Sequence, residues 1–173
     1  MPESVWWSCP STCVVSRRPK KVRAGLVWQP PVAGTLKFNV DGSARGKPGP
    51  AGVREVMRDA DSRILALFSG PVGCLDSNVA EVKAIELAVQ VVAEGVWRER
   101  CVVIESDSQV ALSWVTGLAK RPWRLWDSFA SIDQACQTIS EIHFHYTPRE
   151  ANGFADVLAK EGVDRSSLFL ACI

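Results

Sequence analysis

A strictly alternating stretch, TLKFNVDGS at positions 35–43, is the feature that most constrains the fold of this chain. Apolar and polar residues take turns along it, in the order Leu36, Lys37, Phe38, Asn39, Val40, Asp41. A period of two is typical of a β-strand with one buried face. We expect the strand to end at Asp41-Gly42, where glycine allows a sharp turn, so that the Asp41 carboxylate lies at the rim of the sheet. Asp-Gly also marks ordinary turns, so a site there depends on which other groups reach the same rim.

The composition narrows the classes of protein to which the chain can belong. With 173 residues, 47% of them apolar, it is long enough for one globular domain with a substantial core. A net charge of +1 excludes a global field that attracts polyanions, so contact with nucleic acid requires local basic patches. No apolar run approaches the roughly 18 residues of a membrane span. We expect a monomer that does not bind membranes.

The cysteine pattern bears on metal binding and on the compartment. Six cysteines are scattered along the chain without CxxC pairs, and this argues against a zinc site built from such pairs. We therefore expect free thiols in a reducing, intracellular compartment, either the nucleus or the cytoplasm.

The chain divides into three parts by its patterning. Residues 1–27 have no sustained periodicity and contain the basic run RRPKKVR, which favours a disordered segment or linker. A nuclear-import or phosphate-contacting role for that run stays open. Residues 28–165 carry the periodic elements and are expected to form the domain, and residues 166–173 are expected to be a tail.

Apolar patterns predict four further strands and four helices. The strands are expected at residues 53–58, 63–69, 101–104 and 140–146, and the helices at 79–94, at 109–115, along the stripe Trp126, Phe129, Ile132, Cys136 and Ile139, and at 152–161. The first three strands form a meander and should be antiparallel, whereas the continuous apolar run at 101–104 is typical of a parallel strand. Because Trp126 begins an apolar stripe, we expect it in the core.

One acidic residue of the helix at 79–94 is out of place. The polar stripe of this helix consists of Lys83, Glu86, Gln90 and Glu94. Glu81 lies about 175° from the centre of that stripe, on the side that should face the core. Such a carboxylate costs several kcal/mol unless it is paired or binds a metal. Both a structural and a functional explanation stay open.

Two more acidic residues reach positions where they could join Asp41 and Glu81. Asp107 follows the strand at 101–104, at the edge where open α/β sheets build their sites, although an Asp/Ser helix cap would also explain it. Asp156 lies at the edge of the apolar side of the last helix. Four carboxylates in one place repel one another, and hard divalent ions such as Mg²⁺ would relieve the repulsion. Two such ions can bind both the attacking water and the departing oxygen of a phosphodiester.

Two other groups of residues suggest binding. In the segment GLAKRPWRLW, Lys120, Arg121 and Arg124 alternate with Trp123 and Trp126, a combination that suits a nucleic-acid backbone. His143 and His145 project to one side of the last strand and could share a metal. We find no acidic or cysteine partner next to them in the sequence, so exposed strand histidines are the preferred interpretation.

Several motifs in order resemble one known family. They are WQPP at 28–31, LKFNVDGS at 36–43, PGPAG at 48–52, NVAE at 78–81, ESDS at 105–108, and PREAN at 148–152 with ADVLA at 155–159. Together they resemble the type 1 ribonuclease H-like domains that are abundant in plant retroelement-derived proteins, over about residues 28–162. The resemblance implies an α/β fold with a five-stranded mixed sheet, its first three strands antiparallel and its last two parallel to the first, flanked by helices.

The resemblance also implies an activity and a metal site. The expected activity is endonucleolytic hydrolysis of the RNA strand of RNA–DNA hybrids by two Mg²⁺ ions, with Mn²⁺ as a substitute. By the family pattern, Asp41 touches both metals, and Glu81 and Asp107 complete the site nearer the leaving group. Asp156 completes the site of the metal that activates water.

Other residues are expected to contact the hybrid. By the same resemblance Asn78 contacts its backbone, and Gly42 and Ser43 belong to the motif around Asp41. Arg149 and Asn152 either order their loop or touch substrate. Because the chain has no long basic insertion after the middle helix, the affinity should come from the patch of Lys120, Arg121 and Arg124.

This sequence departs from the family pattern in ways that leave a second hypothesis open. Arg54-Glu55 stand where this type usually has two glycines, and Glu55 alternates with apolar residues, so it should lie unpaired beside packed surface. The loop histidine of many bacterial members is absent, with Tyr146 in its place. The alternative to an active hydrolase is therefore a retroelement-derived domain that binds nucleic acid and no longer cleaves it.

Overall fold

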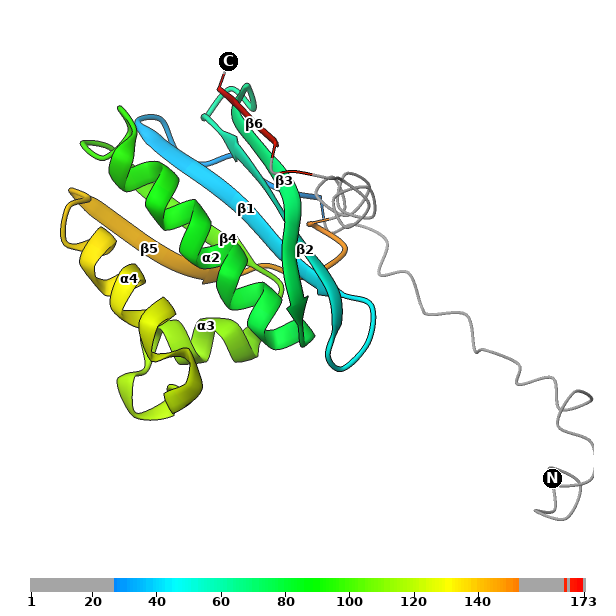
Figure 1. Cartoon of the computed structure of the whole chain (residues 1–173). Coiled ribbons are helices and arrows are strands. Elements are labelled where there is room, and N and C mark those ends of the chain that lie inside the picture. Colours follow the sequence, from blue (N-terminus) through cyan, green and yellow to red (C-terminus); the bar gives the residue numbers. More distant parts are fainter. Residues whose placement is uncertain (1–26, 153–166, 168, 173) are drawn as a thin grey trace, which may run out of the picture.

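The computed structural model describes residues 27–152, 167 and 169–172 of the chain. Its elements are β1 (Thr35–Ala44), β2 (Gly49–Arg58), β3 (Ile64–Leu75), α2 (Ser77–Glu94), β4 (Cys101–Ser106), α3 (Gln109–Thr116), the 3₁₀ turns η2 (Leu118–Lys120) and η3 (Trp123–Leu125), α4 (Trp126–Cys136), β5 (Glu141–Tyr146) and β6 (Phe169–Cys172) (Figure 1). The predictions for the basic run RRPKKVR, for Asp156 and for most of the last helix concern residues outside this description.

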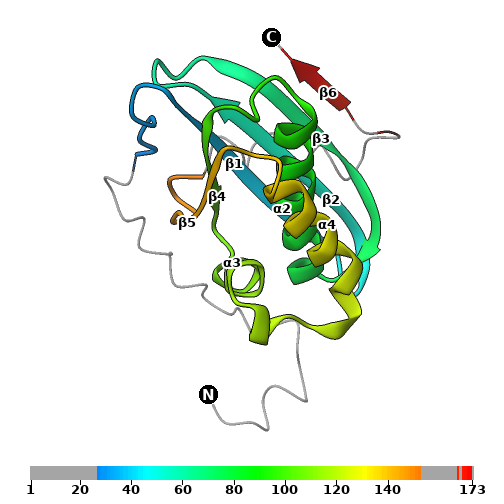
Figure 2. The same cartoon turned by 90° about the vertical axis from the view of Figure 1, so that its left-hand side faces the viewer.

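The strands form one mixed sheet in the order β5-β4-β1-β2-β3-β6. β1, β2 and β3 are antiparallel, while β4 is parallel to both β1 and β5. The predicted five-stranded sheet and its directions are therefore confirmed. A sixth strand, β6, pairs antiparallel with β3 at the outer edge of the sheet (Figures 1 and 2). The sequence pattern had not predicted a strand in this C-terminal segment.

The prediction that β1 ends in a turn at Asp41-Gly42 is wrong. The strand continues to Ala44, and Gly42 is paired with Val53 of β2. A Cβ added at Gly42 would lie 2.2 Å from the backbone carbon of Ala80. Glycine is therefore required here because α2 crosses β1 at close range, and not because the backbone turns.

Two other strands are also longer than predicted. β2 begins at Gly49 and β3 extends to Leu75, whereas the apolar pattern predicts strands only at residues 53–58 and 63–69. Glycine and proline favour loops locally, but here hydrogen bonding to the neighbouring strand keeps these residues in the sheet. The result is a long ribbon next to β1.

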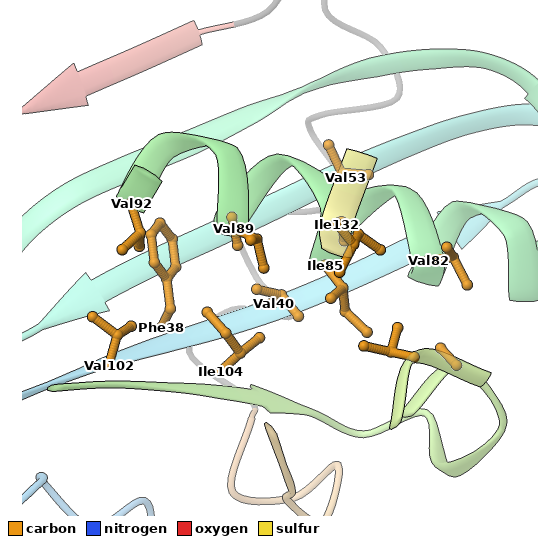
Figure 3. Packing of buried hydrophobic residues seen from close by; sticks show 14 of the residues in the cluster. Phe38, Val40, Val53, Val82, Ile85, Val89, Val92, Val102, Ile104 and Ile132 are labelled. Carbon is orange, nitrogen blue, oxygen red and sulfur yellow. The ribbon is translucent and has the colours of Figure 1, made fainter. Parts of the chain in front are cut away.

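The core lies between one face of the sheet and the helices α2 and α4. Phe38 and Val40 of β1 pack beneath Ile85 and Val89 of α2, and Ile104 of β4 joins them (Figure 3). All five side chains are fully buried. The alternation that predicted β1 is thus the alternation that supplies the core.

The predicted polar stripe of α2 faces α4 as well as solvent. Gln90 donates a hydrogen bond to the Ser131 hydroxyl of α4 over 2.8 Å. Glu86 is buried and pairs with Lys83 at 2.7 Å. The Gln90–Ser131 bond joins the two helices at the margin of the core, whereas the Lys83–Glu86 pair lies within α2.

The prediction that Trp126 lies in the core is wrong. This side chain is 68% exposed, whereas Phe129 and Ile132, further along the same stripe, are fully buried. Trp126 is the first residue of α4, directly after η3. A periodic pattern does not reveal where a helix begins to pack against its neighbour, and for α4 packing begins one turn later.

Glu55 is buried as the sequence predicts. It lies opposite Val40 of β1 and Phe68 of β3, and it is completely inaccessible to solvent. Neither carboxylate oxygen has a hydrogen-bond partner within the part of the chain that the structure describes. Burial raises the pKa of Glu55 well above its ordinary value and so favours the neutral form of the side chain.

Replacing Glu55 by methionine should stabilise the fold by about 1–3 kcal/mol, because an unsatisfied polar group becomes an apolar one of similar length.

In the parent protein the free energy of unfolding should fall as pH rises above 4.5, the ordinary pKa of Glu, since the folded state holds the proton more tightly. Chemical denaturation between pH 4 and 8 measures both effects.

Glu55→Gln should remove this component of the pH dependence. Glu99→Gln, at a side chain that is 79% exposed, is the matched control and should leave the pH profile unchanged. A pH profile of Glu55→Gln identical to that of the parent would contradict a buried, neutral Glu55.

Candidate active site

Three of the four predicted acids come together at the rim of the sheet. Asp41 belongs to β1, Glu81 to the second turn of α2, and Asp107 directly follows β4. One carboxylate oxygen from each lies within 4.8 Å of the others. Asp156 lies outside the described residues, so its predicted place in this group stays a prediction.

The close crossing of α2 and β1 fixes the position of Glu81. The Gly42 N–H donates a hydrogen bond to Oε2 of Glu81 over 3.1 Å. Asp76 caps α2 by accepting from the N–H of Val79, and this defines the turn from which Glu81 projects. Glu81 therefore points to the sheet rim, toward the carboxylates of Asp41 and Asp107.

The pKa values of Glu81 and Asp107 are raised, as expected where carboxylates lie close together. Burial, followed by the charges of Asp41 and Asp107, raises the pKa of Glu81 well above its ordinary value. Burial and then Asp41 also raise the pKa of Asp107, while Arg149 and Arg54 oppose that rise. Three converging oxygen donors that repel one another fit a hard divalent cation such as Mg²⁺ or Mn²⁺.

Arg54 is a member of the site that the sequence did not place there. It lies directly across the β1–β2 ladder from Asp41, and its Nη2 contacts Oδ2 of that carboxylate. The two side chains are only 3% and 7% exposed. The alternation of β2 could have predicted which face Arg54 occupies, but the register that sets it opposite Asp41 belongs to the tertiary structure.

The loop after β5 closes the site from the other side. Nδ2 of buried Asn152 donates to the carbonyl of Val40, next to Asp41, over 3.2 Å. Exposed Arg149 approaches Asp107, with 3.6 Å between Nε and Oδ2. For Asn152, this bond favours the loop-ordering alternative, whereas Arg149 remains available to solvent and substrate.

A second polar network next to the acids was missed at the sequence level. Glu105 accepts hydrogen bonds from Asn39 at 2.8 Å and from the Trp28 indole at 3.2 Å, and it pairs with Lys37 at 2.9 Å. The guanidinium of Arg58 stacks on Trp28. The sequence signal for this network was that Lys37 and Asn39 lie on the same polar face of β1. The network holds β4 against β1 at Glu105, two residues before Asp107.

Some of the predicted nucleic-acid contacts lie on an accessible surface. Asn78 is exposed at the start of α2 and lines a pocket of about 620 Å³ together with Lys47 and Arg124. Arg124 also pairs with Asp76 at 3.1 Å. Lys120 is exposed in the adjacent segment, whereas Ser43 is half-buried and Gly42 is buried against α2.

Arg121, which the sequence predicted to bind nucleic acid, has a structural role. Its side chain is 8% exposed and contacts Asp133 of α4 at 2.6 Å. It also donates to the carbonyls of Trp114 and Val115 and stacks on Phe129. These bonds join α3 to α4. In contrast, Trp123 and Trp126 are 88% and 68% exposed, and Trp126 is therefore more accessible than predicted.

His143 and His145 are both exposed, as the sequence predicts, but His143 has an acidic partner that was not expected. The His143 Nε2 lies 2.9 Å from Oε1 of Glu141, and Cys101 is close enough to offer its sulfur to the same point. Glu141 stands two residues before His143, but Cys101 comes from the neighbouring strand β4. Only the pairing of β4 with β5 brings the thiol there.

The sheet order and the convergent carboxylates define a protein of the ribonuclease H-like superfamily. Residues 39–162 match the family described as reverse transcriptase-like, and the chain belongs to that family. It is 29% identical to ribonuclease HI of Halobacterium salinarum over 80% of its own length and 69% of that protein's. A bifunctional protein of Mycobacterium tuberculosis is 28% identical, and the chain spans 36% of its length.

Solved structures agree with this assignment. RNase H1 of Halobacterium salinarum superposes with a TM-score of 0.68 at 27% identity, over 76% of this chain and 98% of that one. LC11-RNase H1 in complex with an RNA/DNA hybrid gives a TM-score of 0.67 at 30% identity, over 75% of this chain and 96% of that one.

No helix among the described residues could span a membrane.

Three basic positions of one segment should respond differently to alanine. Arg121→Ala should lower the free energy of unfolding by about 2–4 kcal/mol, because it leaves buried carbonyls without their donor. Lys120→Ala and Arg124→Ala should change stability by about 0.5 kcal/mol or less, since both side chains are exposed. The two surface variants should weaken binding of an RNA–DNA hybrid several-fold.

Chemical denaturation and fluorescence anisotropy of a labelled hybrid separate these outcomes. A stable, folded Arg121→Ala protein with weakened hybrid affinity would instead favour the original nucleic-acid role of Arg121.

Proposed function

We propose that this chain hydrolyses the RNA strand of RNA–DNA hybrids with the help of divalent cations. The convergence of Asp41, Glu81 and Asp107 within 4.8 Å carries this proposal. Three elements supply the acids, and each of those elements is fixed by the core or by the sheet. Relatives named as ribonucleases H, one of them in complex with an RNA/DNA hybrid, support the choice of substrate.

The cofactors are two Mg²⁺ ions, for which Mn²⁺ can substitute. Asp41, Glu81 and Asp107 would hold them, together with Asp156, which lies outside the described residues. When bound, such ions activate water and stabilise the charge that develops on the phosphate. The chain keeps the acids in position: the Gly42 N–H holds Glu81, and Asn152 holds the C-terminal loop against β1.

The hybrid would be bound by the surface that adjoins α2. The net charge of +1 gives no global attraction, so the local group of Lys47, Lys120 and Arg124 supplies the contacts to phosphates. The exposed rings of Trp123 and Trp126 would stack on bases or sugars of the hybrid. Asn78, which is exposed one turn before Glu81 in α2, and Arg149, which lies 3.6 Å from Asp107, would hold the backbone of the hybrid.

The origin and context of the chain follow as further parts of the proposal. The order of its motifs, together with a relative named as a putative ribonuclease H protein of Arabidopsis thaliana, 29% identical over 80% of the chain, favours a plant retroelement-derived domain. We assign the domain to residues 28–165, extended at the sheet edge by β6, in an intracellular, monomeric protein. The free thiols of Cys74, Cys101 and Cys136 suit a reducing compartment.

A second candidate function is hybrid binding without cleavage. The contact of Arg54 with Asp41 favours it, because a cation already neutralises the acid that should touch both metals. Buried ion pairs of this kind are hard to break, since either partner alone would remain as an uncompensated charge.

The test is cleavage of a hybrid labelled on its RNA strand, in Mg²⁺ and in Mn²⁺, by the wild type and by Asp107→Asn. We expect the wild type to cleave and the variant to lose about 100-fold or more of the rate, because one oxygen ligand is lost while the shape is kept. Asp61→Asn, at an exposed turn, is the control and should cleave like the wild type.

Two results would reject parts of the proposal. Equal cleavage by Asp107→Asn would rule out this cluster as the site. Hybrid binding by a folded wild type that cleaves in neither metal would replace the proposal with the binding function.

A further inference from the structure

We propose that Arg54 is a built-in cation that competes with the divalent metal for Asp41 and thereby sets the metal requirement of the site. This inference rests on the proposed metal-binding role of the cluster. It concerns a position at which the family resemblance leads one to expect glycine, which has no side chain that could reach the acid.

The geometry gives Arg54 little freedom to leave. It is paired with Asp41 across the antiparallel ladder, so the two Cβ atoms project from the same face of the sheet. The residue as a whole is 2% exposed. Val53 and Met57, on the opposite face of β2, are buried in the core, which prevents β2 from slipping by one residue.

The charge of Arg54 reaches more than one acid. Besides its contact with Asp41, it opposes the rise in the pKa of Asp107. A guanidinium stays protonated at any relevant pH, so it cannot vacate the site by losing its charge, as a buried lysine could. The cluster therefore contains a fixed positive charge within its own set of ligands, and this weakens its attraction for a second cation.

A metal ion can enter in two ways, and both are unfavourable by comparison with a site that has glycine at this position. It can share Asp41 with Arg54, in which case two cations lie side by side at low dielectric. It can displace Arg54, in which case a buried guanidinium loses its contact with Asp41. Either way the wild type should bind divalent ions weakly.

The experiment measures Mn²⁺ affinity directly, by calorimetry and by the EPR signal of the free ion, and hybrid cleavage is assayed separately. Arg54→Met, which keeps the length of the stem and removes the charge, should bind Mn²⁺ at least about tenfold more tightly than the wild type. Arg54→Lys, which keeps a charge, should stay close to the wild type. Asp107→Asn should remove the tight binding and so assign it to the cluster.

Without metal, the variant is expected to be less stable than the wild type, since Asp41 then lacks its contact with a cation. Arg54→Gln, which keeps a hydrogen-bond donor for Asp41, serves as the second variant, and the shift of the melting temperature on adding Mn²⁺ gives a second measurement. A larger shift than in the wild type supports the proposal.

The outcomes separate this inference from the proposed function. Equal Mn²⁺ affinity and equal melting shifts in the wild type and both neutral variants would overturn the role of Arg54, whether or not hybrids are cleaved. Tighter Mn²⁺ binding by Arg54→Met without cleavage would uphold that role and count against the hydrolase.

Independently, the structure assigns a transition-metal site to Cys101, Glu141 and His143. Cys101 is paired with Glu141, and Val103 with His143, across the parallel strands β4 and β5, so the three side chains share one face. One ligand atom of each lies within 4.8 Å of the others. The group begins β4, whereas Asp107 follows its end, about 20 Å away along the strand.

The donor set selects the class of metal. A thiolate, an imidazole and a carboxylate are the ligands of Zn²⁺ in tetrahedral sites with one open position, whereas Mg²⁺ requires oxygen ligands. Glu141 and His143 are exposed and Cys101 is half-buried, so an ion can reach the site without opening the fold. The Glu141 carboxylate already makes hydrogen bonds with the side chains of His143 and Cys101. These bonds lower the pKa of Glu141.

Zn²⁺ calorimetry and the Co²⁺ absorption spectrum test this site, both in the Asp107→Asn background, which removes the acidic cluster as a competitor. We expect one Zn²⁺ per chain and a thiolate-to-cobalt charge-transfer band. Cys101→Ser should abolish the band, and Cys101→Ser and His143→Gln should each weaken Zn²⁺ binding about tenfold or more. Cys74→Ser, at another free and exposed thiol, is the control. Zn²⁺ binding that neither Cys101→Ser nor His143→Gln alters, or a complex without the band, would overturn the assignment.

Discussion

The close crossing of α2 over β1 is the contact on which the site depends. The backbone of Ala80 lies where any side chain at Gly42 would have to be, so the helix can approach the strand only because that position is glycine. The same approach allows the Gly42 N–H to bind Glu81 and directs an acidic residue of a core helix to the sheet rim. A larger residue at position 42 would move α2 and separate Glu81 from Asp41. Packing and chemistry are therefore set by one backbone contact.

Two neighbouring ionisable residues of β2, Arg54 and Glu55, lie on opposite faces of the sheet and have different surroundings. Arg54 points to the rim and pairs with Asp41, while Glu55 points into the core, where burial raises its pKa and favours its neutral form. Both replace expected glycines, yet one changes the electrostatics of the site and the other changes the stability of the fold. The strand tolerates the pair because a carboxyl can lose its charge and an arginine can find a partner.

Much of the fold could be predicted from local patterns, because alternation and helical periodicity report directly on which face is buried. The strand at β1, the helix α2 and the parallel strand β4 were all expected close to their observed positions. Strand ends were less predictable, since hydrogen bonding to a neighbour extends β2 and β3 through glycine and proline. Exposure was mistaken at Trp126, because periodicity does not reveal where one helix meets another.

The sequence by itself determined the elements of the sheet that bear the acids and the residue types that could bind a cation. Asp41 at the rim, Glu81 on the wrong side of its helix and Asp107 after a buried strand were all visible from pattern alone. Only the tertiary structure decided that Arg54 lies across from Asp41, and that Cys101 joins Glu141 and His143. These are contacts between strands, and strand register depends on pairing partners that are remote in sequence.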